Sequence, residues 1–214
     1  FGISCAPEAA SLTALGLHAL QHRGQDSAGI VTSDKSNFFA HRGMGQVSEV
    51  FSDVNLFNTL KGEISIGHNR YGTTGESALK NVQPLFSELN IGGIAIAHNG
   101  NLTNTHHLKD QLIKSGSIFQ STSDTEVILH LISTASGTLL ERLTYALNSI
   151  RGAFSLVLMT KDSLIGIRDP FGIRPLVLGK YKKSYVLSSE SCGLDIIGAD
   201  LVRDIEPGEL VIIK

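Results

Sequence analysis

The stretch that most constrains the fold reads Ile91-Gly92-Gly93-Ile94-Ala95-Ile96-Ala97-His98-Asn99-Gly100-Asn101-Leu102. Its apolar run, 91–98, has the length and composition of a buried β-strand. The run ends in Asn-Gly, the pair most typical of a type I′ hairpin turn. However, the following residues lead into a helix predicted at Thr105–Lys114. A second interpretation therefore stays open, in which the Asn99 side chain and the Gly100 backbone N–H form an oxyanion hole.

Short extended runs flank this strand along the chain, and helices are interspersed among them. Strands are predicted at 28–33, 38–42, 64–68, 154–160, 164–168, 174–179, 185–189 and 209–213. Helices are predicted at 11–22, 48–60, 105–114, 125–135 (with Asp124 as the capping residue) and 138–150. Neighbouring strands joined by tight turns are antiparallel. The order therefore predicts an α+β fold, a four-layer αββα sandwich of two antiparallel sheets between helices.

Composition excludes several classes of function. The formal net charge is -2 and there is no basic cluster, so neither nucleic acid nor an acidic membrane surface is an expected partner. The apolar runs are too short to cross a bilayer, and the amino end lacks a secretory signature. The two cysteines, Cys5 and Cys192, form no CxxC pair. A cytoplasmic protein with reduced thiols and no metal site is expected.

A second polar segment reads Gly67-His68-Asn69-Arg70-Tyr71-Gly72-Thr73-Thr74-Gly75. An arginine at the end of a strand suits two-pronged recognition of a carboxylate or phosphate. The glycine-rich loop behind it could close over a small ligand. An ordinary surface loop with a solvated arginine is the alternative.

A third polar segment, Ser123-Asp124-Thr125-Glu126, opens a predicted helix. Asp124 can cap that helix, and its carboxylate can also bind an ammonium group. The three segments together supply a cation, an anion and a pair of groups that polarise a carbonyl. Such a set fits an α-amino acid with a side-chain carbonyl, such as glutamine or asparagine.

Five segments resemble, in the same order, the glutaminase domains of the amidophosphoribosyltransferase family. They are Gly16-Leu17-His18-Ala19-Leu20-Gln21-His22-Arg23-Gly24-Gln25-Asp26-Ser27-Ala28-Gly29-Ile30, Ala97–Leu102, Ser123–Val127, Arg168-Asp169-Pro170-Phe171-Gly172-Ile173-Arg174-Pro175-Leu176 and Ser189–Cys192. The resemblance covers essentially the whole chain, so one glutaminase domain is expected over 1–214. The Leu-Gln-His-Arg-Gly-Gln wording favours this branch over sugar-phosphate and aspartate-amidating relatives.

The resemblance implies the N-terminal nucleophile fold and hydrolysis of glutamine to glutamate and ammonia. The ammonia would serve the synthesis of 5-phosphoribosylamine, the first step of purine biosynthesis. The resemblance also implies the residues of the site: Arg70 for the α-carboxylate, Asp124 for the α-ammonium, Asn99 and Gly100 as oxyanion donors, Thr73 in the closing loop, and Arg23 at the amino-terminal end.

The nucleophile of this family is an amino-terminal cysteine whose own α-amine accepts the proton. Family members resemble a Cys-Gly-x-Phe-Gly-Ile start, whereas this chain begins Phe1-Gly2-Ile3. The nucleophile is therefore expected three positions ahead of Phe1. Cys5 is internal, and Cys192 is expected to be a small buried hydrophobe, so neither is expected to replace it. A non-catalytic glutamine-binding or scaffold domain is the alternative.

The family resemblance also fixes the expected partners. The phosphoribosyltransferase domain of the family is not in this chain, and Mg and any iron–sulfur cluster would belong to that domain. No cofactor is expected within 1–214. The expected partners are glutamine, the phosphoribosyltransferase domain of the same enzyme, and further copies in a homo-oligomer.

Overall fold

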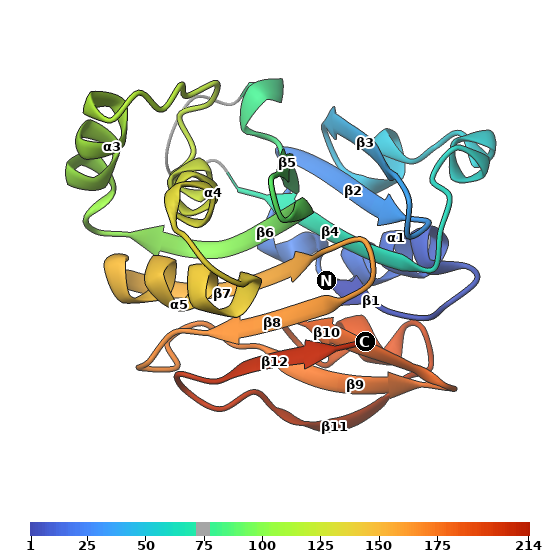
Figure 1. Cartoon of the computed structure of the whole chain (residues 1–214). Helices are drawn as coiled ribbons and strands as arrows, with labels where there is room; N and C mark the ends of the chain where they lie inside the picture. Colours follow the sequence, from blue (N-terminus) through green and yellow to red (C-terminus); the bar gives the residue numbers. More distant parts are fainter. Residues whose placement is uncertain (72–77) are drawn as a thin grey trace.

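A computed structural model gives the structure of residues 1–71 and 78–214. In it, two antiparallel sheets of seven and five strands are stacked between layers of helices (Figure 1). The predicted α+β sandwich is confirmed.

The seven-stranded sheet has the order β11-β9-β10-β1-β4-β2-β3. Its strands are β1 (Gly2–Ile3), β2 (Ser27–Ser33), β3 (Phe38–Met44), β4 (Ile64–Arg70), β9 (Val177–Tyr181), β10 (Ser184–Ser188) and β11 (Asp200–Asp204). The short strand β1 is central, because Gly2 pairs with Leu187 of β10 and with Ile66 of β4. Both pairings are antiparallel, so the amino end of β1 lies toward the carboxyl end of β4.

The five-stranded sheet has the order β12-β8-β7-β6-β5. Its strands are β5 (Leu85–Leu89), β6 (Gly92–Leu102), β7 (Gly152–Met159), β8 (Leu164–Arg168) and β12 (Leu210–Ile213). The prediction that the strand at 91–98 ends at His98 is wrong, because β6 continues to Leu102. Asn99 and Gly100 pair with Ser155 and Phe154 of β7, so the Asn-Gly pair is not a hairpin turn. The apolar pattern stops at His98 because polar side chains follow, but backbone pairing continues.

The helices are α1 (Ala9–Ala19), η1 (Gln21–Arg23), α2 (Val47–Val50), η2 (Val54–Asn58), η3 (Leu79–Asn81), α3 (Thr105–Lys114), α4 (Asp124–Thr134), α5 (Leu139–Ser149) and α6 (Cys192–Asp195). The single helix predicted at 48–60 is instead two short ones, α2 and η2. Asp124 is not the cap of α4: the Ser123 side chain accepts from the Thr125 N–H, and Asp124 is the first helical residue. Among the described residues, no helix has the length and apolarity needed to span a bilayer.

Three apolar clusters separate the four layers. Leu17 and Ile30 belong to the cluster between α1 and the seven-stranded sheet. Ile66 and Val157 belong to the cluster between the two sheets. Ile128 of α4 belongs to the cluster under α3, α4 and α5. Complete burial of such a side chain contributes roughly 1.5–3 kcal/mol. The stacking of the two sheets brings the ends of β4 and β6 together.

Candidate active site

A cavity of about 350 Å³ opens where β4 and β6 end, a size typical of small-molecule sites. Five of the six predicted site residues line it: Arg23, Arg70, Asn99, Gly100 and Asp124. The sixth, Thr73, lies outside the described residues. The structure therefore brings together residues that are up to 101 positions apart between Arg23 and Asp124.

Arg70 is the last residue of β4 and is almost fully buried, with 6% of its surface exposed. A Cβ atom at Gly24 would lie 2.5 Å from the Arg70 carbonyl carbon, so only glycine permits this close approach. The contact carries the neighbouring Arg23 to the cavity wall. A buried guanidinium beside an open cavity suits recognition of an anion.

Asp124 is held between α4 and the end of β6. Its Oδ2 accepts a hydrogen bond from the Leu102 N–H at 3.1 Å, and its Oδ1 lies 3.4 Å from His98 Nδ1. Burial raises the pKa of this carboxyl, but His98 and the N–H groups of Leu102 and Thr125 outweigh burial and hold the pKa below its usual value. Asp124 is thus a carboxylate at neutral pH and can bind an ammonium group.

The Asn99 side chain carries a buried donor. Its Nδ2 has no hydrogen-bond partner within residues 1–71 and 78–214. A buried donor left unpaired costs about 1–3 kcal/mol, so a ligand acceptor here would be favourable. At Gly100 a Cβ atom would collide with the Ala153 carbonyl and come within 2.8 Å of His98 Nε2. Glycine is therefore required at this position for β6 to pair closely with β7.

A second, smaller cavity of about 50 Å³ shares Arg23, His68, Asn69 and Asn99 with the first. Phe1 also lines it. The amino end of β1 therefore opens onto the same site. Neither Cys5, which is exposed, nor Cys192 lines either cavity.

Two histidines at the site carried no predicted role. His68 Nε2 lies 3.0 Å from the His98 backbone oxygen, and this contact joins β4 of one sheet to β6 of the other. Burial lowers the pKa of His68 to about 3, so its ring is neutral and Nε2 must carry the donated hydrogen. Each histidine stands within two positions of a predicted site residue, Arg70 or Asn99, and that proximity was the available sequence signal.

The low pKa of His68 predicts a loss of stability in acid. The unfolded chain takes up this proton below about pH 6.5, whereas the folded chain does so only near pH 3, so stability falls as pH drops between these values. His68→Gln should reduce the difference in unfolding free energy between pH 7 and pH 5 by about 2 kcal/mol. Urea denaturation at both pH values measures it. His107→Gln, exposed on α3, is the control, and an equal effect of both variants would contradict the assignment.

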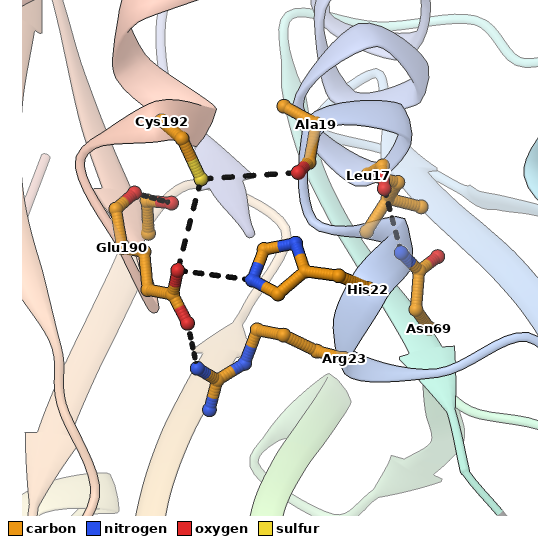
Figure 2. A network of polar contacts seen from close by, with 8 residues as sticks. Leu17, Ala19, His22, Arg23, Asn69, Glu190 and Cys192 are labelled. Atoms are coloured by element: carbon orange, nitrogen blue, oxygen red, sulfur yellow. Dashed lines mark hydrogen bonds and ion pairs between the residues drawn. The ribbon is translucent and has the colours of Figure 1, made fainter.

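A polar network of Glu190, His22 and Arg23 holds the Arg23 side chain in place (Figure 2). The Glu190 carboxylate pairs with Arg23 Nη1, and its other oxygen lies 3.0 Å from His22 Nε2. Cys192 is predicted to be a small buried hydrophobe, but it is only half-buried, at the start of α6. Its Sγ lies 3.8 Å from Glu190 Oε2. Burial and the Glu190 charge raise the pKa of the Cys192 thiol, which makes it a poor nucleophile.

Comparison with known proteins adds independent information. The family of glutamine amidotransferase domains matches residues 68–195. The amidophosphoribosyltransferase of Rhizobium etli is 54% identical over 213 residues, which are 99% of this chain and 43% of that protein. The amidophosphoribosyltransferase of Bacillus subtilis is 46% identical and is matched by 100% of this chain over 45% of its own length. The chain thus spans less than half the length of these relatives.

Two solved structures have the same fold as this chain. The glutamine phosphoribosylpyrophosphate amidotransferase of Bacillus subtilis, complexed with ADP and GMP, superimposes with a TM-score of 0.94 at 44% identity. A structure described as the allosteric regulatory enzyme of purine biosynthesis superimposes with a TM-score of 0.96 at 45% identity. Each match covers 100% of this chain and 46% of the other.

Proposed function

Because the chain belongs to the family of glutamine amidotransferase domains, we propose that it is the glutamine-hydrolysing domain of an amidophosphoribosyltransferase. One observation carries the proposal: Arg70, Asp124, Asn99 and Gly100 line one cavity. These residues supply a cation, an anion and a carbonyl-polarising pair within a volume that suits one amino acid. In this proposal, glutamine binds with its α-carboxylate on Arg70 and its α-ammonium on Asp124.

The side-chain amide of glutamine then reaches the other end of the cavity. Its carbonyl oxygen takes the place beside Asn99 Nδ2, the buried donor that has no partner in the described part of the chain. The hydrogen bond from this donor is strongest when the oxygen becomes negatively charged, because an N–H in a shielded site stabilises an oxyanion more than a neutral carbonyl. Asn99 and the Gly100 N–H therefore serve the transition state more than they serve binding.

The register of β1 indicates where a nucleophile would lie. Phe1 and Gly67 exchange two backbone hydrogen bonds, of 2.8 and 3.1 Å, so the ladder with β4 reaches Phe1. Continued in the same register, the third position ahead of Phe1 falls opposite Arg70, at the cavity. A cysteine at that position, as the family resemblance implies, would have both its thiol and its α-amine at the site.

The chemistry follows from these positions. The thiol passes its proton to the α-amine, and the sulfur bonds to the side-chain carbon of glutamine. The tetrahedral oxyanion then collapses: the α-ammonium returns its proton to the amide nitrogen, the C–N bond breaks, ammonia leaves and a thioester remains. Water then attacks the thioester, releases glutamate and restores the thiol. The ammonia would be used by the phosphoribosyltransferase domain of the same enzyme, with glutamate as the second product.

The proposal is tested with a chain that carries Cys-Gly-Val ahead of Phe1 and a free α-amine on the cysteine, hereafter the extended chain. We expect the extended chain to release ammonia from glutamine and to be labelled on that cysteine by a glutamine-like electrophile. The same chain with serine in place of that cysteine is the control and should do neither. Binding of glutamine without ammonia release by the extended chain would support a scaffold role instead.

We also propose a cytoplasmic location, because Cys5 and Cys192 are both free thiols and free thiols are typical of reducing compartments.

A further inference from the structure

We propose that Glu190 is a positioning residue of the glutaminase site, which holds the Arg23 guanidinium beside the amino end of β1. The inference rests on the proposed function, because the group that Arg23 would assist is the nucleophile of glutamine hydrolysis. Figure 2 shows the Glu190 carboxylate facing the Arg23 and His22 side chains, with one oxygen toward each.

Glu190 and Arg23 come from segments that are far apart in the sequence. Glu190 follows the end of β10, and Arg23 ends η1, which follows α1. One carboxylate oxygen of Glu190 accepts from Arg23 Nη1, and the other lies 3.0 Å from His22 Nε2. Both oxygens are thus used to hold η1 against the segment after β10.

The Glu190–Arg23–His22 network, hereafter the clamp, lies at the end of the sheet where β1 begins. β1 lies between β10 and β4. The clamp joins Glu190, two residues after the end of β10, to the segment that packs on the end of β4 through Gly24 and Arg70. Arg23 lines both site cavities. The clamp therefore fixes a cation where the extension of β1 would enter the site.

The Arg23 charge acts at this point. Arg23 and Phe1 line the same small cavity, so the guanidinium lies beside the start of β1. A cation beside a thiol favours the thiolate, which is the reactive form. An arginine side chain without a partner samples many rotamers, whereas a charge-assisted bond to a carboxylate restricts it. Glu190 thereby keeps the Arg23 charge near the nucleophile.

A direct electrostatic role for Glu190, acting through its own charge and not through Arg23, predicts the opposite change in thiol reactivity. The Glu190 carboxylate is itself negative, and by charge alone it would disfavour a nearby thiolate. Its removal would then increase the reactivity of the thiol. A positioning role predicts a decrease, because Arg23 is released toward solvent. The sign of the change in reactivity separates the two roles.

The test compares Glu190→Gln, Arg23→Gln and the double variant in the extended chain. Glu190→Gln should lower kcat for glutamine by about tenfold to a hundredfold, since small losses of alignment have effects of that size. KM should change less than twofold. The double variant should be no slower than Arg23→Gln alone, because Glu190 acts through Arg23. Alkylation of the upstream cysteine by iodoacetamide should also slow in Glu190→Gln.

Glu209→Gln is the matched control, because it breaks the Arg203–Glu209 pair, which lines neither site cavity. It should leave kcat and alkylation unchanged. The inference is overturned if Glu190→Gln behaves like this control, if its effect multiplies with that of Arg23→Gln, if alkylation becomes faster, or if the activity lost only follows a fall in Tm. Failure of the parent extended chain to hydrolyse glutamine would instead count against the proposed function, and the alkylation rates would still test Glu190.

Discussion

Asn99→Ala is expected to lower kcat for glutamine hydrolysis in the extended chain by about a hundredfold to a thousandfold. The variant removes Nδ2, a buried donor without a partner in the described residues, and Asn99 lines both site cavities. In the proposed reaction this donor meets a full negative charge only in the transition state. KM should therefore change by less than about threefold, since a neutral carbonyl gains little from the same donor. Steady-state ammonia release across a range of glutamine concentrations measures both constants.

Two further variants sharpen this test. Asn99→Asp keeps the shape of the side chain but replaces the donor with a negative acceptor, so it should be at least as slow as alanine. Asn101→Ala removes an exposed asparagine of the same strand that lines neither cavity, and it should keep its kcat. If Asn99→Ala raised KM and left kcat unchanged, Asn99 would bind substrate only in the ground state.

The sequence predicts the layers of this fold well because local patterns determine them. The helix Thr105–Lys114 is observed with its predicted bounds, and Leu143 and Ile150 of the segment predicted to be helical at 138–150 are buried in the cluster against the five-stranded sheet. β11 escaped prediction because all five of its residues are exposed on an edge strand, so no alternation marks it. β5 follows Pro84 directly, and its short run gives only a weak pattern.

The residues of the site also differ in how far local sequence patterns predict them. Arg70 and Asn99, which line the cavity, each follow an apolar run, and the abrupt change from apolar to polar residues marks them in the sequence. No local pattern in the sequence marks Glu190, because its partner Arg23 lies 167 positions away. Asp124 was expected to cap its helix. Ser123 caps the helix instead, which leaves the Asp124 carboxylate to accept from Leu102 at the cavity.

Arg70→Lys is expected to raise KM for glutamine in the extended chain by roughly tenfold to a hundredfold, the equivalent of one charge-assisted hydrogen bond. A guanidinium can donate two parallel bonds to a carboxylate, whereas an ammonium acts as a point charge on a shorter reach. The change in kcat should be smaller, because the α-carboxylate keeps its charge throughout the reaction. The inhibition constant of glutamate should rise by the same factor, since glutamate carries the same α-carboxylate.

A truncated substrate tests which group Arg70 binds. 4-Aminobutanamide is glutamine without its α-carboxylate, so its kcat/KM should be nearly the same in the parent and in Arg70→Lys. Arg42→Lys is the matched control, because Arg42 is a partly buried arginine of β3 that lines a different cavity. An equal loss for glutamine and for 4-aminobutanamide in Arg70→Lys would mean that Arg70 supports the cavity without contacting the α-carboxylate. A loss confined to glutamine and glutamate would locate that contact, because only those two molecules carry the group that a two-pronged donor distinguishes from a point charge.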